Sequence, residues 1–298
     1  MKRLTVAGKL MPSLASAFRE KFHPLHQIRR VRAFRKLLSL ADVSIWARVH
    51  GVRWKVRIRL VRDLSHLLLS RSPEPHVTAL FETVVELFRP RVFWDVGAYF
   101  GYYGFLVKSL DESAVVVLCE PDPENAALIR QTLAPLRLDG LELLQAAVSD
   151  ESGSATFVAD PVSGSTGTLE ADESLADKHW GDTRLVIVRT VTLDNELGES
   201  GDVDFLKIDV EGHEEKVIRG ASQTLQRCRP VVVFECFHGG DEICSTLEAL
   251  GYAILDAERL GPRTPETGNF LGLPPQHRAR QDELLQRWRA RLNGHREG

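Results

Sequence analysis

The densest group of ionisable side chains follows an apolar run that is typical of a buried strand. The run is Val203 to Ile208, and Asp209, Glu211 and His213 come after it. If the extended conformation persists beyond the run, these alternate residues project from one side before Gly212 permits a turn into a helix. Such groups can take a proton from a reacting hydroxyl, and His213 is the more natural base because an unperturbed His has a pKa of about 6.5. These three residues are the predicted catalytic residues.

A glycine-bearing turn follows a shorter apolar run, Val92 to Val96. It reads Asp95-Val96-Gly97-Ala98-Tyr99-Phe100-Gly101. Glycines four apart permit close approach of a ligand, and the acid can accept hydrogen bonds from a cationic or hydroxylated ligand. A dinucleotide site would show G-x-G-x-x-G, whereas the order here is Gly97, Gly101, Gly104, which disfavours a nicotinamide-dependent dehydrogenase.

Two further strand ends suit a nucleoside. Glu120 follows the apolar run Ala114 to Cys119, and a carboxylate there can bind both hydroxyls of a ribose. The small residues Ala146 and Ala147 follow the next run and leave room for an adenine. The alternative is that Glu120 is simply a solvated acid at a strand end.

A magnesium-assisted reaction is an alternative to direct proton removal. Asp209, Glu211, His213 and Glu235 could supply oxygen and nitrogen ligands to such an ion, and His238 directly follows the predicted strand Val231–Phe237. No resident metal is part of the main prediction. The other alternative is a protein that binds a nucleoside cofactor without catalysing a reaction.

Strands and helices alternate through the region that carries these residues. Apolar periodicity predicts them at the following ranges: helices at His76–Phe88, Gly101–Leu110, Pro123–Leu136, Glu214–Gln226 and Glu242–Leu250, and strands at Val92–Val96, Ala114–Cys119, Leu141–Leu144, Val203–Ile208, Val231–Phe237 and Tyr252–Leu255. This order predicts an α/β fold, a mostly parallel sheet with helices on both faces. The candidate residues then meet at one edge of the sheet.

Added pieces lie within and after this region. Strands at Ala155–Val158 and Leu185–Val191 flank a polar stretch, Asp160 to Asp182, which is either a lid or a plain surface insertion. A helix is expected at Gln281–Leu292.

Composition is that of an ordinary globular protein. The 298 residues are 43% hydrophobic and 27% charged, with a net charge of -3. No apolar run reaches the roughly 18 residues of a membrane span, and the four cysteines contain no C-x-x-C pair. We therefore expect a cytoplasmic protein without disulfides.

Positive charge is concentrated near the N-terminus. Leu25 to Leu40 predicts a basic amphipathic helix, and Val52 to Leu60 predicts a strand with one cationic face. Either the apolar sides pack on the main domain and the charges stay in water, or the region contacts an anionic substrate, a charged glycan or a membrane surface. No nucleic-acid motif is present. The predicted organisation is a basic extension (1–75), a main domain (76–275) and a C-terminal helix (276–298).

Taken together, these motifs resemble the FkbM family of S-adenosylmethionine-dependent methyltransferases. The matching segments in chain order are Asp95–Ala98 with Gly101, Glu120–Pro123, Ala146–Asp150 with Gly153, Gly164–Thr166, Thr192–Asp194, Asp204–Glu214, Gly220–Ala221, and Arg229–Pro230 with Glu235.

The resemblance implies a Rossmann-like class I methyltransferase with a seven-stranded sheet whose last strand, Phe270–Leu273, runs antiparallel. It implies methyl transfer to a hydroxyl of a sugar, glycan or natural-product acceptor, with S-adenosyl-L-methionine as cofactor. The cofactor-binding residues would be Asp95, Gly97, Ala98, Tyr99, Gly101, Glu120, Pro121, Ala146 and Ala147. The family commonly has Asn in place of Tyr99, so contacts to the methionine end of the cofactor are expected to differ.

Overall fold

The computed structural model describes residues 41–68, 72–136, 138–159, 167–169, 184–199, 201–236, 240–259 and 261–297. The predicted helix Leu25–Leu40, most of the stretch Asp160–Asp182, and His238 lie outside these residues. Among the helices that are described, none is long and apolar enough to cross a bilayer.

A mostly parallel sheet forms the centre of the molecule. Its strands are β3 (Val92–Val96), β4 (Val115–Cys119), β5 (Leu141–Leu144), β9 (Phe205–Ile208), β10 (Val231–Glu235), β11 (Ala253–Asp256), β12 (Gly261–Pro262) and β13 (Asn269–Leu273). The order is β12-β11-β13-β10-β9-β3-β4-β5. Strands β5, β4, β3, β9 and β10 pair in parallel, and β13 is antiparallel to both of its neighbours. The reversed last strand is confirmed, but the sheet has eight strands because β12, too short to show periodicity, adds an edge.

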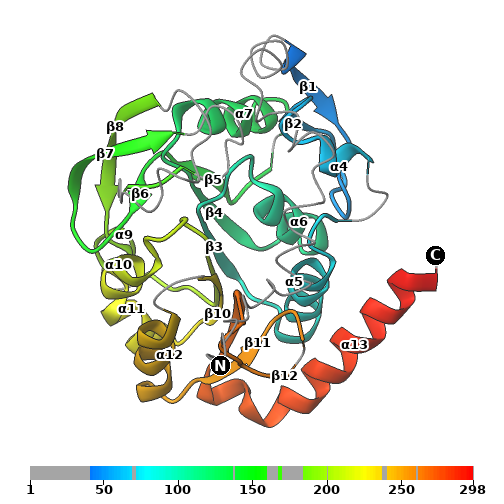
Figure 1. The fold of residues 1–298 in the computed structure, drawn as a ribbon, viewed down its shortest axis with the longest axis vertical. Coiled ribbons are helices and arrows are strands. Elements are labelled where there is room, and N and C mark those ends of the chain that lie inside the picture. The colour runs from blue at the N-terminus through cyan, green and yellow to red at the C-terminus, as the bar shows by residue number, and fades with distance from the viewer. Residues whose placement is uncertain are drawn as a thin grey trace, which may run out of the picture.

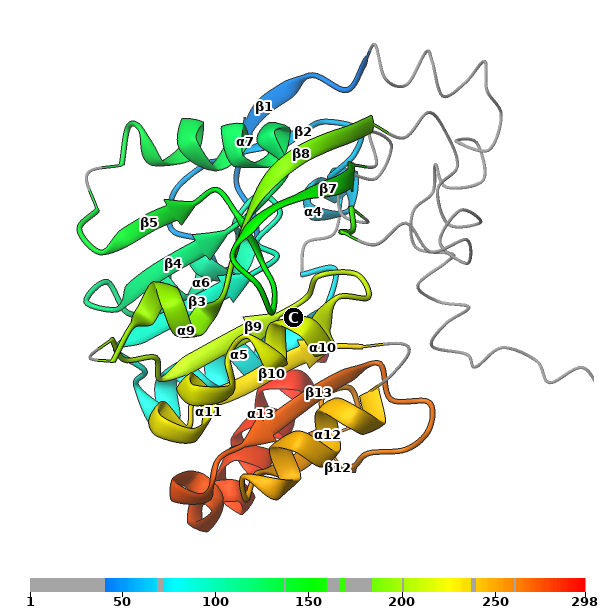
Figure 2. The same cartoon turned by 90° about the vertical axis from the view of Figure 1, so that its left-hand side faces the viewer.

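Helices cover both faces of this sheet, as predicted. They are α5 (Pro75–Phe88), α6 (Tyr102–Leu110), α7 (Pro123–Leu133), α9 (Leu193–Leu197), α10 (Glu214–Arg219), α11 (Ser222–Cys228), α12 (Gly240–Ala249) and α13 (Gln281–Glu297). Figure 1 shows α5, α6 and α13 on one side of the strands and α9 to α12 on the other. Each set packs into its own apolar core against the sheet. Figure 2 shows the same layers turned by 90°.

Local signals explain where several helices begin and end. Helices α5 and α7 both have proline in the first turn, where the missing N–H is no loss. The Asp122 side chain caps α7 by accepting a hydrogen bond from the backbone N–H of Glu124 at 2.7 Å. Helix α5 ends at Arg89, whose φ of 49° is left-handed, directly before Pro90. These ends lie within a few residues of the predicted ones.

The predicted single helix Glu214–Gln226 is instead two helices, α10 and α11. A side chain at Gly220 would place its Cβ 2.0 Å from the backbone oxygen of Ser149, so this position must remain glycine. The Asp194 carboxylate caps α11 by accepting from the N–H groups of Gln223 and Thr224. Because these partners are distant in sequence, helical periodicity did not reveal the break.

A hairpin precedes the main sheet. Strands β1 (Ser44–Ala47) and β2 (Val56–Arg59) pair antiparallel and lead into α4 (Leu64–Leu68). The predicted strand Val52–Leu60 is therefore shorter, because a turn occupies its first residues. The buried side chains of the hairpin share a core with α5, α6 and α13. Arg57 donates to Gln131, and Arg59 forms an ion pair with Asp42. Much of the cationic face is thus satisfied within the chain.

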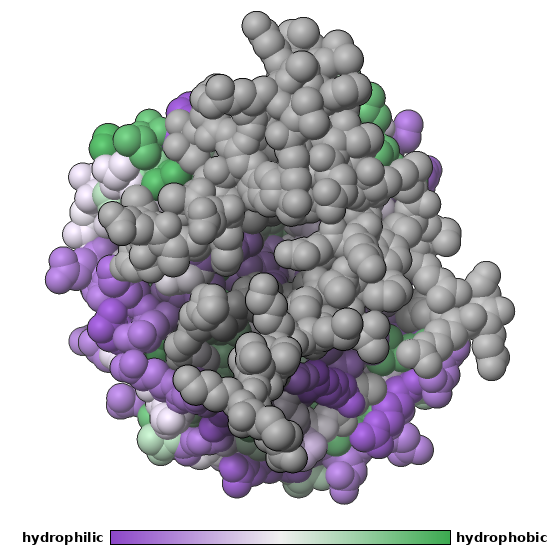
Figure 3. Space-filling model, viewed as in Figure 1, coloured by the Kyte–Doolittle hydropathy of each residue, from purple (hydrophilic) through white to green (hydrophobic). Residues whose placement is uncertain are grey.

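A second, three-stranded sheet stands beside the main one. It consists of β6 (Ala147–Val148), β8 (Arg184–Val191) and β7 (Gly153–Ala159), in that order. The two predicted added strands are confirmed as the antiparallel pair β7 and β8. Figure 3 shows hydrophobic residues at this side of the molecule, where Leu185 and Ile187 of β8 are exposed. Between these strands and the main sheet lies the candidate site.

The predicted C-terminal helix docks on α5. Leu284 and Trp288 of α13 are fully buried, and the Trp288 indole Nε1 donates to the backbone oxygen of His76 at 3.0 Å. Arg291 adds an ion pair with Glu82 at 3.1 Å. Helix α13 therefore completes the core on this face of the sheet.

Replacement of Trp288 by alanine should lower the free energy of unfolding by about 3–5 kcal/mol, because it empties a buried site that cannot collapse fully. Urea unfolding followed by circular dichroism measures this loss. Gln286→Ala, at an exposed position of the same helix, is the control and should be near neutral. Equal midpoints for the two variants would contradict the docking of α13.

Candidate active site

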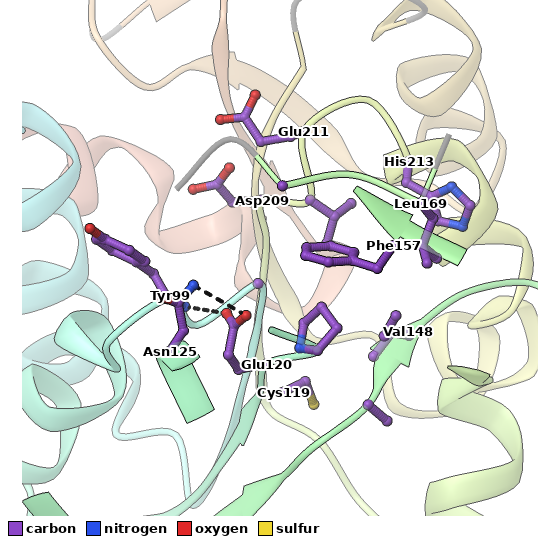
Figure 4. A pocket seen from close by; sticks show the side chains of 16 residues that line it. Tyr99, Cys119, Glu120, Asn125, Val148, Phe157, Leu169, Asp209, Glu211 and His213 are labelled. Atoms are coloured by element: carbon purple, nitrogen blue, oxygen red, sulfur yellow. Dashed lines mark hydrogen bonds between the residues drawn. The ribbon is translucent and has the colours of Figure 1, made fainter. Parts of the chain in front are cut away.

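A pocket opens at the carboxyl ends of β3, β4 and β9, where ligands of parallel sheets bind. Figure 4 shows its lining. The lining residues come from these strand ends, from α7 and from the second sheet: Gly97, Tyr99, Cys119, Glu120, Pro121, Asn125, Ala146, Ala147, Val148, Phe157, Gly167, Leu169, Asp209, Val210, Glu211 and His213. Most of the predicted site residues are thus brought together.

The floor of the pocket is a close contact between the loops after β3 and β9. Gly97 has a φ of 81°, and a Cβ built on it would lie 1.8 Å from the backbone oxygen of Asp209. Only glycine fits both constraints. The backbone N–H groups of Gly97 and Ala98 donate to the Cys119 carbonyl at 3.1 and 3.0 Å, which joins the end of β4 to the same floor.

A buried lysine connects the two loops electrostatically. The Lys207 ammonium lies 3.5 Å from Asp95 Oδ1 and 3.2 Å from Asp209 Oδ2, and it donates to the Gly97 carbonyl at 3.3 Å. Burial raises the pKa of Asp95, and the Lys207 charge opposes that rise. Asp95 also accepts from the N–H of Gly104 at 3.1 Å. This carboxylate therefore lies behind the loop and does not line the pocket.

Glu120 is held from three directions. It is 4% exposed. Its Oε2 accepts from the backbone N–H of Tyr99 at 2.7 Å, and its Oε1 accepts from the N–H of Asp122 at 2.8 Å and from the Asn125 amide at 3.4 Å. Burial raises the pKa of Glu120 to about 8. These hydrogen bonds give the carboxylate a fixed orientation.

Tyr99 adopts a left-handed backbone conformation, with a φ of 57°. Asn tolerates this region better than other non-glycine residues, which accounts physically for the Asn that the resemblance led us to expect here. The Tyr99 hydroxyl donates to Asp63, and the Arg62 guanidinium lies 5.3 Å from the centre of its ring. Burial raises the pKa of Tyr99 well above its usual value, so the phenol keeps its proton.

The three predicted catalytic residues do not project from one side. Strand β9 ends at Ile208, and Glu211 and Gly212 have φ angles of 53° and 97°, so the chain turns before His213. Asp209 and Glu211 point to one side of the pocket, and His213 lies at its other side (Figure 4). The His213 ring bonds Ser149 Oγ through Nε2 at 2.9 Å. The extended conformation expected beyond Ile208 is therefore wrong.

The pocket has one polar and one apolar side. Asp209 and Glu211 border the polar side, and the side chain of Asp209 is 31% exposed. The apolar side includes Val148, Phe157 and Leu169. Of the residues predicted from the sequence, Asp95, Ala98 and Gly101 do not line the pocket.

Sequence reasoning missed part of the lining: Cys119, Asn125, Val148, Phe157, Gly167, Leu169 and Val210. Val148 and Val210 adjoin predicted residues, and Cys119 ends a predicted strand, so proximity to those signals could have found them. Phe157 and Leu169 belong to the second sheet and its neighbouring segment. No local pattern indicates that this sheet faces the main one.

The proposed magnesium ligands do not converge. Within the described part of the chain, no three or more His, Cys, Asp and Glu side chains are placed to hold one metal ion. Glu235 ends β10 and does not line the pocket. The Asp209 carboxylate instead contacts the Lys207 ammonium.

Comparisons with known proteins point to one family. The family model described as the methyltransferase FkbM domain matches residues 95–254. The chain is 28% identical over 230 residues to the hexuronic acid methyltransferase AglP of Haloferax volcanii. The matched region covers 74% of this chain and 82% of that protein. It is 31% identical over 152 residues to the 2-O-methyltransferase NoeI of Sinorhizobium fredii, covering 46% of this chain and 60% of that protein.

Solved structures of methyltransferases are similar at lower identity. One is a methyltransferase FkbM from Methylobacillus flagellatus, with a TM-score of 0.42 and 14% identity over 61% of this chain and 43% of that one. Another is an O-methyltransferase from Bacillus cereus in complex with SAH, with a TM-score of 0.40 and 16% identity over 71% of this chain and 86% of that one. The α/β fold predicted for this chain is confirmed by its own strand order, and the family match identifies that fold as a methyltransferase domain.

Lys207→Met should lower the free energy of unfolding by about 3–5 kcal/mol at neutral pH, because it leaves the buried Asp95 carboxylate without its cation. Protonation of Asp95 removes that unpaired charge. Because the pKa of Asp95 is already raised by burial, the variant's deficit should shrink as the pH falls toward the acid range.

Denaturant unfolding at several pH values measures this effect. The double variant with Asp95→Asn should recover part of the loss at neutral pH. Lys55→Met, at an exposed lysine, is the matched control and should stay within about 0.5 kcal/mol. A deficit that does not change with pH would exclude an uncompensated Asp95 charge as its cause.

Proposed function

The chain belongs to the FkbM methyltransferase family, and we propose that it transfers a methyl group from S-adenosylmethionine to a hydroxyl of a sugar. The observation that carries this proposal is the buried Glu120 carboxylate beside the Gly97 loop, with the partly exposed Asp209 carboxylate in the same pocket. A site for the sugar diol of a nucleoside and a site for a hydroxyl acceptor are then adjacent.

The chemistry of the pocket fits this cofactor. An adenine suits the apolar side formed by Val148, Phe157 and Leu169. Glu120 is placed to accept hydrogen bonds from both ribose hydroxyls. The methionine portion would lie at the Gly97–Tyr99 loop, where Asp95 and Gly101 act by shaping the loop. Pro121, Ala146 and Ala147 complete the adenosine side.

When bound, S-adenosylmethionine supplies a methyl group on a positively charged sulfur with a good leaving group. The protein then chiefly aligns the acceptor and takes its proton as the attack develops. We assign proton acceptance to Asp209, whose Oδ2 is fixed by the Lys207 ammonium at 3.2 Å. Glu211 points to the same side and would bind a second hydroxyl (Figure 4). His213, bonded to Ser149, is the remaining candidate base.

A sugar is the proposed acceptor class for two reasons. Two relatives are named for methylation of a hexuronic acid and for 2-O-methylation. Neighbouring carboxylates, as at Asp209 and Glu211, accept hydrogen bonds from the adjacent hydroxyls of a sugar ring. Contacts of the basic N-terminal region with a charged glycan or a membrane surface stay a prediction.

Calorimetric titration should detect binding of S-adenosylhomocysteine and none of NAD. Its affinity should rise as the pH increases through about 8, the pKa of Glu120, because only the ionised carboxylate accepts from both ribose hydroxyls. Glu120→Gln should bind weakly and show no rise centred there. Absence of binding to the folded wild-type protein would contradict the proposed cofactor.

Asp209→Asn should lower turnover by about 100-fold or more, the contribution typical of a general base, while the affinity for S-adenosylhomocysteine stays close to that of the wild type. Glu211→Gln and His213→Ala should have smaller effects on turnover. The assay measures transfer of a labelled methyl group to uronic acid and neutral sugar glycosides.

Asp202→Asn, before β9 and exposed, is the matched control and should retain full turnover. Wild-type turnover in Asp209→Asn would remove Asp209 from the reaction. A larger loss in His213→Ala than in Asp209→Asn, with cofactor binding intact in both, would transfer the base to His213.

A further inference from the structure

Two residues of the N-terminal segment, outside the region that matches the family, contact side chains that line the pocket. They are Arg62 and Asp63, between β2 and α4, whereas the family match begins at residue 95. Both are deeply buried, with exposures of 6% and 2%. Burial of two charged side chains is costly unless they are paired, so their partners indicate their role.

Arg62 contacts Glu120 through one intermediate. Its Nη2 donates to Asn125 Oδ1 at 2.8 Å, and Asn125 Nδ2 lies 3.4 Å from Glu120 Oε1. A guanidinium can only donate hydrogen bonds, so it forces the oxygen of the Asn125 amide to face Arg62. The amide nitrogen then faces Glu120. Loss of Arg62 removes this constraint on the amide, and a flipped amide would place its oxygen against the carboxylate.

Asp63 contacts Glu120 through a different intermediate. Asp63 accepts a hydrogen bond from the Tyr99 hydroxyl, and the backbone N–H of Tyr99 donates to Glu120 Oε2 at 2.7 Å. Tyr99 holds a left-handed backbone conformation that is unfavourable for its residue type. Its side-chain bond to Asp63 helps to keep this conformation.

The pair is itself held by the hairpin. Asp42 accepts hydrogen bonds from the backbone N–H groups of Val61 and Arg62 at 2.8 and 3.0 Å. Asp63 Oδ2 accepts from the N–H of Arg59 at 2.7 Å. The turn after β2 is thus rigid on the side away from the pocket, and its two charged side chains point inward.

We propose that Arg62 and Asp63 are positioning residues of the cofactor site, which orient the two oxygens of Glu120 toward the ribose through Asn125 and Tyr99 respectively. This inference rests on the proposed function. Each path ends on a different oxygen of the same carboxylate, which a pair serving only to anchor the hairpin would not require.

Arg62→Met should raise the dissociation constant of S-adenosylhomocysteine about tenfold, the loss expected for one hydrogen bond involving a charged group. The KM for S-adenosylmethionine should rise by a similar factor and kcat should fall less. Tyr99→Phe, which removes the hydroxyl that Asp63 accepts from, should weaken binding in the same direction. Calorimetry on each folded variant gives the constants.

A double-mutant cycle tests whether Arg62 acts through Asn125. If it does, Arg62→Met combined with Asn125→Ala should bind no more weakly than Asn125→Ala alone. Arg57→Met is the matched control, because Arg57 lies on the same hairpin and bonds Gln131 of α7 instead of the site. It should leave the dissociation constant unchanged. Arg62→Gln is measured in parallel and should weaken binding even if Arg62→Met does not fold.

The outcomes separate this inference from the proposed function. If the wild-type protein fails to bind S-adenosylhomocysteine, the proposed function is wrong. If the wild type binds and the folded Arg62 variants bind equally well, or if the two effects in the cycle simply add, the positioning role is wrong. A lower melting temperature with an unchanged dissociation constant would assign Arg62 to the stability of the hairpin alone.

Discussion

The arrangement of the site depends on the contact between the loops after β3 and β9, which come from strands over 100 residues apart in the chain. Gly97 lies so close to the Asp209 carbonyl that no side chain fits at this position. The Lys207 ammonium contacts both loops, because it donates to the Gly97 carbonyl and pairs with the Asp209 carboxylate. One cation thereby compensates a buried carboxylate and orients an exposed one. Close packing alone would not fix the direction of the Asp209 side chain; the charge of Lys207 does so.

Burial divides the acidic residues of the site into separate roles. Asp95 is enclosed beneath the loop, Glu120 is buried but lines the pocket, and Asp209 is partly exposed. The same chemical group is thus a buried counter-ion to Lys207 at Asp95, while the roles proposed for Glu120 and Asp209 are those of an oriented hydrogen-bond acceptor and of a residue that contacts the methyl acceptor. The difference lies in what surrounds each carboxylate, since all three come at or just after the ends of adjacent parallel strands.

The sequence predicted the sheet and its helices well because each is set by local apolar periodicity, as in β3 and α5. It also identified Gly97, Glu120 and Asp209, since strand ends meet at one edge of a parallel sheet. It failed where distant contacts decide the conformation. The direction of His213 depends on the turn at Glu211 and Gly212, and the break between α10 and α11 depends on contacts made by Asp194 and Ser149. The burial of Arg62 could not be predicted because a basic segment gives no sign of where one guanidinium will be buried.

The position of β13 has a consequence for how the chain reaches this structure. Strand β13 lies between β10 and β11, although both precede it in the chain. Until β13 arrives, β10 presents an unpaired edge on a strand whose first four residues are apolar, and β11 has nothing to pair with on that side. Unpaired edges of this kind recruit other chains during folding. Assembly of the sheet beyond β10 therefore waits for Asn269–Leu273, and until then the edge of β10 is open to pairing with other chains.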